Sequence, residues 1–321
     1  MKALVTGGAG FIGSHIVDRL INEGYDVVVI DDLTSGRKEN LNARAKFYKA
    51  DIREQKIDKI FWKEKPDFVF HEAAQIDVGT SIENPSFDAD VNLIGTLKLF
   101  ENCIQNGVKK IIIPSSAAIY GEPTQFPIPE NARKFPTIPY AFGKLAVEQY
   151  ADFYSRVYNM GVSILRYSNV YGPRQSSPGE GVVVEKLIKK YLKSEEPVIY
   201  GDGNQTRDFI FVGDVVEASL LAAKKTTPSP LNVSTSKETT INDLAEKVAK
   251  ILSKKTKPRH APARLHEVYR SCLDNRLAKK VLGWEPKVSL SDGLKITIDS
   301  FLMGKKNKDL VNQHKFTKAV R

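Results

Sequence analysis

The sequence predicts an α/β fold, a doubly wound parallel sheet followed by a smaller C-terminal α/β lobe. In the first half, short runs rich in Val, Ile and Phe alternate with amphipathic stretches of helical length. The short runs are apolar on both faces, as expected for a parallel sheet with helices on both sides. Gly24, Gly107 and Gly161 each follow a helical stretch, at the place where a C-terminal glycine belongs.

Strands and helices alternate along the first half, and this order gives right-handed crossovers in a doubly wound sheet. The predicted strands are Lys2–Thr6, Asp26–Ile30, Lys46–Lys49, Phe68–His71, Lys110–Ser115 and Ser163–Tyr167. The predicted helices are Phe11–Glu23, Ser86–Asn106 and Tyr140–Tyr158. We therefore expect residues 1–170 to form one domain, to which residues 207–235 return.

The pattern after Tyr171 is less regular, which favours a smaller lobe of residues 171–303 that binds substrate. Short strands are expected around Val198 and Phe209. Helices are expected at Val183–Leu192, Asp214–Lys224, Ile241–Leu252, Asn275–Leu282 and Ser291–Phe301. Residues 304–321 form a basic tail, which we expect to be solvated and flexible.

The composition restricts the possible functions. The net charge is +10, but residues 304–321 alone carry six Lys or Arg and one Asp, so half of the excess lies on that tail and a nucleic-acid partner is not expected. No apolar run approaches the ~20 residues that cross a bilayer, and no signal peptide is recognisable, so a cytoplasmic location without membrane contact is expected. Two distant cysteines, Cys103 and Cys272, provide neither a disulfide framework nor a metal site.

A glycine-rich turn opens the chain between the first predicted strand and helix. Gly7, Gly10 and Gly13 have GxxGxxG spacing. The first glycine permits a tight turn, the second allows a pyrophosphate to approach the backbone, and the third allows close packing of helix on sheet. Because the trio stands in the strand–turn–helix context that the motif requires, it predicts a dinucleotide site.

Asp31 ends the second predicted strand, 18 residues after Gly13. A carboxylate at this place accepts hydrogen bonds from a ribose and repels a 2′-phosphate, so it favours NAD over NADP. Asp32 fits a turn residue as well. The basic residues Arg37 and Lys38 follow closely, so the sequence does not exclude NADP as the cofactor.

Tyr140 and Lys144 form a YxxxK pair on one helix face. A lysine ammonium lowers the pKa of a neighbouring phenol, which can then act as a base near neutral pH. Ser116 follows the fifth predicted strand, where side chains point into the crevice of an open α/β sheet. Ser116 could therefore bind a reacting hydroxyl while Tyr140 removes its proton, although an isolated YxxxK is more often a solvated pair.

Together these motifs resemble the extended short-chain dehydrogenase/reductases with their Rossmann fold, and especially UDP-glucose 4-epimerases. The resemblance covers Met1–Phe301. The motifs are TGGAGFIGSH, DIR, HEAAQIDV, VNLIGT, SSAAIYG, YAFGK, LRYSNVYGPR, YGDGNQTRDFIFVGDV and LGWEP.

The resemblance implies an isomerase that epimerises a UDP-sugar at C4 through bound NAD, with Ser116, Tyr140 and Lys144 as its catalytic residues. The cofactor residues that it implies are Gly7, Gly10, Phe11, Ile12, Gly13, Asp31, Asp32, Ser35, Gly36, Asp51, Ile52, Ala73, Ala74, Gln75, Asn92, Ser115, Tyr140, Lys144 and Tyr167. The substrate residues that it implies are Val78, Ser116, Tyr140, Asn169, Val183, Tyr200, Arg207, Arg264 and Ser271. No metal is implied.

Several alternatives stay open at this point. The same scaffold serves uronate 4-epimerases, decarboxylases and reductases, and a non-enzymatic member could bind a dinucleotide or RNA. Ala117 and Ala118 stand where related dehydratases and decarboxylases usually place an acid. Glu72 is also unusual for the family, and the sequence assigns it no role.

Two further expectations concern sugar size and assembly. By the family's pattern, the residue seven positions after Arg264 faces the sugar, and the small Ser271 leaves space for a 2-acetamido group. A slip of two residues would place Tyr269 there instead, and Ser271 could also be a loop hydroxyl. Helices Ser86–Asn106 and Tyr140–Tyr158 keep apolar residues beyond one buried stripe, which indicates a homodimer.

Overall fold

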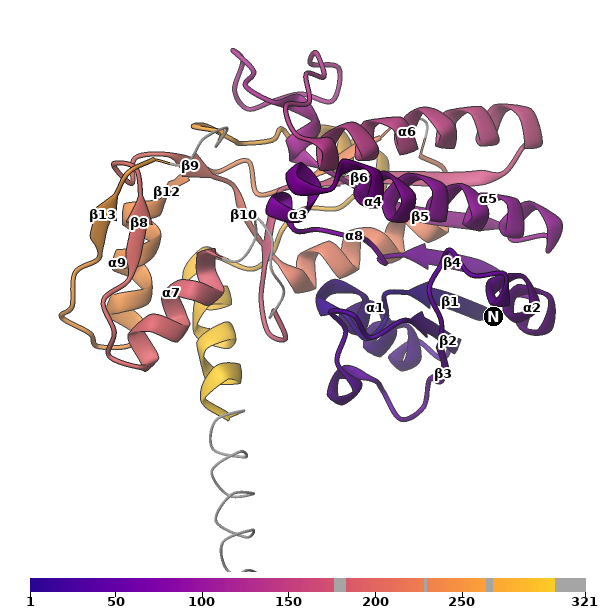
Figure 1. The fold of residues 1–321 in the computed structure, drawn as a ribbon, viewed down its shortest axis with the longest axis horizontal. Coiled ribbons are helices and arrows are strands. Elements are labelled where there is room, and N and C mark those ends of the chain that lie inside the picture. Colours follow the sequence, from indigo (N-terminus) through magenta and orange to yellow (C-terminus); the bar gives the residue numbers. More distant parts are fainter. Residues whose placement is uncertain (176–182, 228–229, 264–267, 304–321) are drawn as a thin grey trace, which may run out of the picture.

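The protein is built on a parallel sheet of seven strands, seen in a computed structural model that describes residues 1–175, 183–227, 230–263 and 268–303 (Figure 1). In spatial order the strands are β11 (Leu231–Val233), β6 (Gly161–Tyr167), β5 (Lys110–Ser116), β4 (Phe68–His71), β1 (Lys2–Thr6), β2 (Asp26–Asp31) and β3 (Lys46–Lys49). From β1 the successive strands β2 and β3 are added on one side, and from β4 the strands β5 and β6 are added on the other, so the order reverses between β1 and β4. Ligands bind at the carboxyl ends of strands beside such a reversal.

Helices cover both faces of this sheet, as the two-sided apolar strands predict. On one face lie α1 (Phe11–Asn22), α8 (Val212–Lys224) and α10 (Arg276–Leu282), which share a core with Val5 and Val29. The other face carries α2 (Lys56–Glu64), α5 (Gly95–Gln105) and α6 (Pro139–Tyr158). Cys103 is fully buried in this second core, as the sequence predicts.

The smaller part of the molecule lies beside the sheet and has its own core (Figure 1). Helices α7 (Val183–Leu192), α9 (Ile241–Ile251) and residues 290–303 pack there around Tyr171 and Leu244. Three short strand pairs complete this part: β7 (Asn169–Tyr171) with β10 (Phe209–Phe211), β8 (Val198–Tyr200) with β13 (Arg259–Ala261), and β9 (Thr206–Arg207) with β12 (Thr239–Thr240). The division into domains stays a prediction.

The predicted helix Ser86–Asn106 is not a single α-helix. It consists of α4 (Pro85–Ala89), a π-helical turn at Asp90–Ile94 and α5. The side chain of Asn92, in the π turn, bonds to the backbone of Gln75 in the loop after β4. A π turn adds one residue to the repeat, so an apolar pattern of period 3.6 does not reveal it. Helices α2 and α3 (Val78–Glu83) are not predicted by the sequence either.

Candidate functional site

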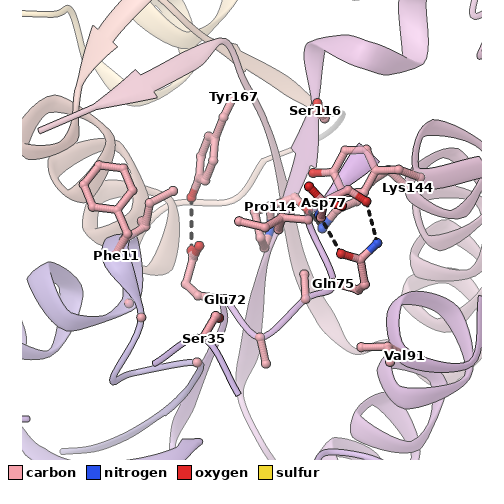
Figure 2. Close-up of a pocket in the computed structure, with 18 of the residues that line it drawn as sticks. Phe11, Ser35, Glu72, Gln75, Asp77, Val91, Pro114, Ser116, Lys144 and Tyr167 are labelled. Atoms are coloured by element: carbon pink, nitrogen blue, oxygen red, sulfur yellow. Dashed lines mark hydrogen bonds between the residues drawn. The ribbon is translucent and has the colours of Figure 1, made fainter. Parts of the chain in front are cut away.

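A cavity of about 810 Å³ opens at the carboxyl ends of the sheet strands (Figure 2). Its walls come from the loops after β1, β2, β4, β5 and β6, from α6, and from residues 207, 268 and 271 of the smaller part. The cavity therefore lies where the strand order predicts a ligand.

The glycine-rich turn forms one end of this cavity. Gly7 has φ +67°, and a Cβ on it would lie 2.6 Å from the backbone nitrogen of Ala73. A Cβ on Gly13 would overlap the carbonyl oxygen of Gly7. Helix α1 begins directly after Gly10, with Phe11 and Ile12 in the cavity wall. The start of a helix at a close-packed glycine turn suits a pyrophosphate.

Asp31 is held at the edge of the cavity by two backbone hydrogen bonds. Its Oδ2 accepts from the Ala9 N–H at 2.9 Å and its Oδ1 from the Leu33 N–H at 2.8 Å. A Cβ on Gly36 would lie 2.5 Å from Oδ1, so only glycine leaves the carboxylate this position. Burial raises the pKa of Asp31. Asp32 and Ser35 also line the cavity, in the arrangement that the sequence predicts for an NAD-selective edge.

An arginine that the sequence analysis did not consider joins this edge. Arg53 lines the cavity and holds Asp51 through several hydrogen bonds, the shortest from Nη2 to Oδ2 at 2.6 Å. It also binds Asp90 at 2.7 Å. The hydrogen bonds from Arg53 lower the pKa of Asp51. Asp51 and Ile52 both line the cavity, and the hydrogen bonds from Arg53 favour the ionised form of Asp51.

Two predicted ligand residues lie behind the wall. Asn92 is buried, and its amide accepts from the Gln75 N–H and donates to the Gln75 carbonyl, both at 2.9 Å. Asn92 therefore positions Gln75, which does line the cavity together with Ala73 and Ala74. Val78, at the start of α3, does not line it.

Ser116, Tyr140 and Lys144 all line the cavity, and Ser116 and Lys144 are labelled in Figure 2. Ser116 ends β5, and its Oγ accepts from the Ala118 N–H at 3.2 Å. Lys144 Nζ donates to the Pro114 carbonyl at 3.0 Å and lies 5.8 Å from the centroid of the Tyr140 ring. Burial lowers the pKa of Lys144 to about 8. At neutral pH the ammonium therefore persists in the same cavity as the Tyr140 phenol.

Ser115 gives independent evidence that the cavity is built for a polar ligand. Its Oγ is buried, and among the described residues it has no hydrogen-bond partner. Buried hydroxyls are normally paired, so a ligand hydrogen bond would satisfy this one. The glycine turn, the Asp31 edge and Ser115 together fit a dinucleotide.

The predicted substrate residues divide into two groups. Asn169, Arg207 and Ser271 line the cavity. Val183 and Tyr200 do not. Arg264 lies outside the described residues.

Arg207 and its chain neighbour Asp208 bond to different partners. Asp208 points into the interior, where it accepts hydrogen bonds from Thr235 and Ser236. Burial raises the pKa of Asp208 to about 6. Arg207 Nη1 donates to the Thr206 carbonyl at 2.8 Å, and the residue faces the cavity.

Ser271 and Tyr269 differ in whether they reach the cavity. Ser271 lines the cavity, whereas Tyr269 is 56% exposed and does not. Ala117, Ala118 and Thr137 also line the cavity. The two alanines place no acid next to Ser116.

Comparisons with known proteins agree with this geometry. The family model for GDP-mannose 4,6 dehydratase matches residues 4–297. UDP-glucose 4-epimerase of Mycolicibacterium smegmatis is 41% identical over 308 residues, which cover 94% of this chain and 98% of the relative.

Two solved structures are also similar. UDP-glucose 4-epimerase of Thermotoga maritima, solved with UDP-glucose, has a TM-score of 0.93 at 46% identity and covers 95% of this chain and 99% of its own. UDP-glucose 4-epimerase of Thermus thermophilus, solved with NAD, has a TM-score of 0.89 at 39% identity and covers 94% and 99%.

Proposed function

Since this chain belongs to the GDP-mannose 4,6 dehydratase family of extended short-chain dehydrogenase/reductases, as an NAD-dependent UDP-sugar 4-epimerase, we propose that it interconverts UDP-glucose and UDP-galactose through Ser116, Tyr140 and Lys144. One observation carries the proposal: these three side chains line the same cavity as the glycine turn that fits a dinucleotide. A base, a hydroxyl and a cofactor site therefore share one space.

Each residue has a distinct part in the proposed reaction. The Lys144 ammonium lowers the pKa of Tyr140, and the resulting tyrosinate removes the O4 proton. Ser116 Oγ hydrogen-bonds O4 and orients it. A dinucleotide held by the glycine turn and the Asp31 edge would supply the hydride acceptor for C4 and the hydride donor for the opposite face of the 4-keto sugar. Tyr140 then gives the proton back.

Binding energy must lie in the nucleotide diphosphate, since the sugar has to turn over between the two half-reactions. Arg207 and Asn169 line the same cavity as Ser116. The planar guanidinium of Arg207 suits a diphosphate. On the sequence pattern, Arg264 is the second diphosphate ligand.

The composition of the cavity favours epimerisation over elimination or decarboxylation. Ala117 and Ala118 both line it, so the position after Ser116 provides no proton donor. Epimerisation needs none, because every proton and hydride that leaves C4 and O4 returns. We further propose that the small Ser271 admits 2-acetamido sugars.

We also propose a homodimer formed by α4, α5 and α6. These helices lie side by side along one face of the sheet (Figure 1). Large apolar side chains are exposed on α4, on α6 and on the π turn between α4 and α5: Phe87, Ile94, Phe142, Tyr150, Phe153, Val157 and Tyr158. Such a patch indicates a protein interface.

We propose a cytoplasmic location as well. No helix in the described ranges is long and apolar enough to span a bilayer. Both cysteines are buried and unpaired, as is usual in a reducing compartment.

The test is to incubate the purified protein with UDP-glucose and no added cofactor. UDP-galactose should form, and denaturing the protein should release NAD, because the cofactor is regenerated at every turnover. Strict dependence on added NADPH would instead indicate a reductase that consumes its cofactor.

A further inference from the structure

Glu72 stands in the cavity wall at the end of β4, and neither the motifs nor the proposed reaction uses it. Its carboxyl points toward Tyr167, which ends β6 (Figure 2). The Tyr167 hydroxyl lies 3.3 Å from Glu72 Oε1 and 3.0 Å from the Oγ of Ser219 in α8. Ser219 Oγ in turn donates to the Val215 carbonyl at 2.9 Å. These groups form a line of three oxygen–oxygen contacts.

Counting hydrogens shows that this line is short of a donor when Glu72 is ionised. The three contacts need three hydrogens, and the hydroxyls of Tyr167 and Ser219 bring one each. The Val215 carbonyl can only accept, and so can a carboxylate. If Ser219 donates to Val215 and Tyr167 donates to Ser219, the contact between Glu72 and Tyr167 needs a hydrogen from Glu72. A protonated carboxyl satisfies all three contacts.

The surroundings of Glu72 favour the same protonated form. Burial raises the pKa of Glu72 to about 8, although Lys144 and the hydrogen bond to Tyr167 act in the opposite direction. Lys144 in α6 is the cation that faces Glu72. Its chain neighbour His71 is buried, and its pKa is lowered to about 3, so it carries no charge at neutral pH. Ser219, on α8, is uncharged.

We propose, on the basis of the epimerase function above, that Glu72 keeps its proton in the working enzyme and donates it to Tyr167. Glu72 is then a positioning residue that fixes the Tyr167 ring in the cavity wall. Because it is neutral, it does this without placing a negative charge near Lys144. The charge of Lys144, which Asp88 and Glu148 also support, then acts on Tyr140 without an opposing carboxylate at position 72.

Infrared difference spectroscopy of the purified holoenzyme tests the proton directly. The wild type minus E72Q spectrum should show a protonated-carboxyl carbonyl band at pH 7 that disappears as the pH rises through about 8. Subtracting E72Q isolates Glu72 from other buried carboxyls such as Asp208. If the carboxylate band of Glu72 is already present at pH 7, the proposal is wrong.

Ser219→Ala is the matched variant, because it removes two of the three contacts and leaves only the one between Glu72 and Tyr167. The single hydrogen of Tyr167 then becomes available to a Glu72 carboxylate, so the band should disappear at a lower pH than in the wild type. An unchanged midpoint would overturn the hydrogen count. Alanine is a good helix former, so α8 should tolerate the change.

Activity with UDP-glucose provides the second readout. Glutamine can donate to Tyr167 and cannot ionise, whereas alanine can do neither. E72Q should therefore retain up to about tenfold more kcat than E72A at pH 7, the size of one hydrogen bond. Equal losses in the two variants would contradict a donor role. If no UDP-galactose forms in any variant while the band titrates as expected, the proposed function fails and the protonated Glu72 stands.

Discussion

At the scale of single residues, the chemistry depends on which side chains carry charge at neutral pH. Lys144 has lost part of its basicity to burial, but with a pKa of about 8 it remains largely an ammonium at pH 7. Tyr140 lies in the same helix, one turn earlier. The ammonium lies 5.8 Å from the centroid of the Tyr140 ring, where a positive charge favours the ionised phenol that the proposed reaction needs.

Tyr140→Phe should therefore nearly abolish turnover, with a loss of about 10²- to 10⁴-fold in kcat, because the variant lacks the base. The NAD content of the purified variant should match that of the wild type, since the ring volume is kept. Tyr150→Phe, an exposed position on the same helix, is the control. Comparable turnover in Tyr140→Phe and Tyr150→Phe would remove Tyr140 from the mechanism.

A second prediction concerns Glu72 and the pH dependence of the free energy of unfolding. Its pKa is raised from 4.5 to about 8 by folding, so the folded state holds the proton more tightly than the unfolded state. The stabilisation from this proton is complete below pH 4.5 and is lost as the pH rises to about 8. Glu72→Gln does not titrate. As the pH rises from 5 to 8, the free energy of unfolding of the wild type should therefore fall relative to that of Glu72→Gln. The difference should be about 2 kcal/mol after allowance for partial solvent screening.

Urea denaturation of both proteins at pH 5, 6.5 and 8 measures this difference. A constant gap between the two stability curves would mean that Glu72 ionises normally in the folded state.

Ser271 makes the third prediction at this scale. Ser271→Tyr should fill the cavity where a 2-acetamido group would lie. The ratio of activities on UDP-N-acetylgalactosamine and UDP-galactose should fall roughly 5- to 150-fold, the effect of overpacking by 1–3 kcal/mol. Tyr269→Ser is the control, because Tyr269 is exposed and does not line the cavity. A wild type that ignores the acetamido sugar would disprove the idea before any variant is made.

At the scale of elements, a buried ion pair fixes the catalytic helix on the sheet. Arg166 in β6 and Glu148 in α6 are joined by two hydrogen bonds of 2.6 and 2.9 Å and are almost fully buried. Arg166 also donates to the Tyr120 hydroxyl at 2.7 Å. Glu148 lies one turn after Lys144 in α6, so the ion pair between Arg166 and Glu148 fixes the position of α6 on the sheet and with it the positions of Lys144 and Tyr140.

Glu148→Ala should lower the free energy of unfolding by about 3–5 kcal/mol, because it leaves the Arg166 charge buried without its partner. Asp152→Ala breaks the exposed pair with Arg156 one turn later and should cost less than about 1 kcal/mol. Urea denaturation followed by circular dichroism compares them. Equal costs would show that the buried pair has no special role.

The sequence predicts elements well where one physical pattern dominates. All six predicted strands of the sheet are present. The inner strands are largely buried and mainly apolar, whereas the edge strand β3 has only Phe47 and Tyr48 between two exposed lysines. The glycine turn is in place because a Cβ at Gly7 or Gly13 would clash. No local pattern predicts the π turn at Asp90–Ile94 or the two hydrogen bonds between the Asn92 side chain and the Gln75 backbone. Both depend on contacts between residues distant in sequence. The contacts of Arg53 cannot be predicted from the local sequence for the same reason, since only the fold brings Asp90 to it.

At the scale of the whole molecule, the exposed apolar face on α4, on the π turn after it and on α6 should be covered by a second copy. Phe142 and Phe153 are 58% and 42% exposed on α6. Light scattering at micromolar concentration should report a dimer for the wild type. Phe153→Glu should shift it toward the monomer, because a charge is then buried at the interface. Trp62→Glu, on α2 outside this face, is the control and should stay dimeric. A monomeric wild type would reject the dimer.

The position of β11 beside β6 has a consequence for how the protein is made on the ribosome. The sheet neighbours β6 and β11 are separated by the 63 residues of chain between Tyr167 and Leu231. At a synthesis rate of about 5–20 residues per second, β6 waits roughly 3–13 s with one unpaired edge. An unpaired edge strand is a template for aggregation. The nascent chain is thus most vulnerable after its NAD-binding motifs have emerged and before β11 does, and a chaperone that shields this edge should raise the yield of folded enzyme.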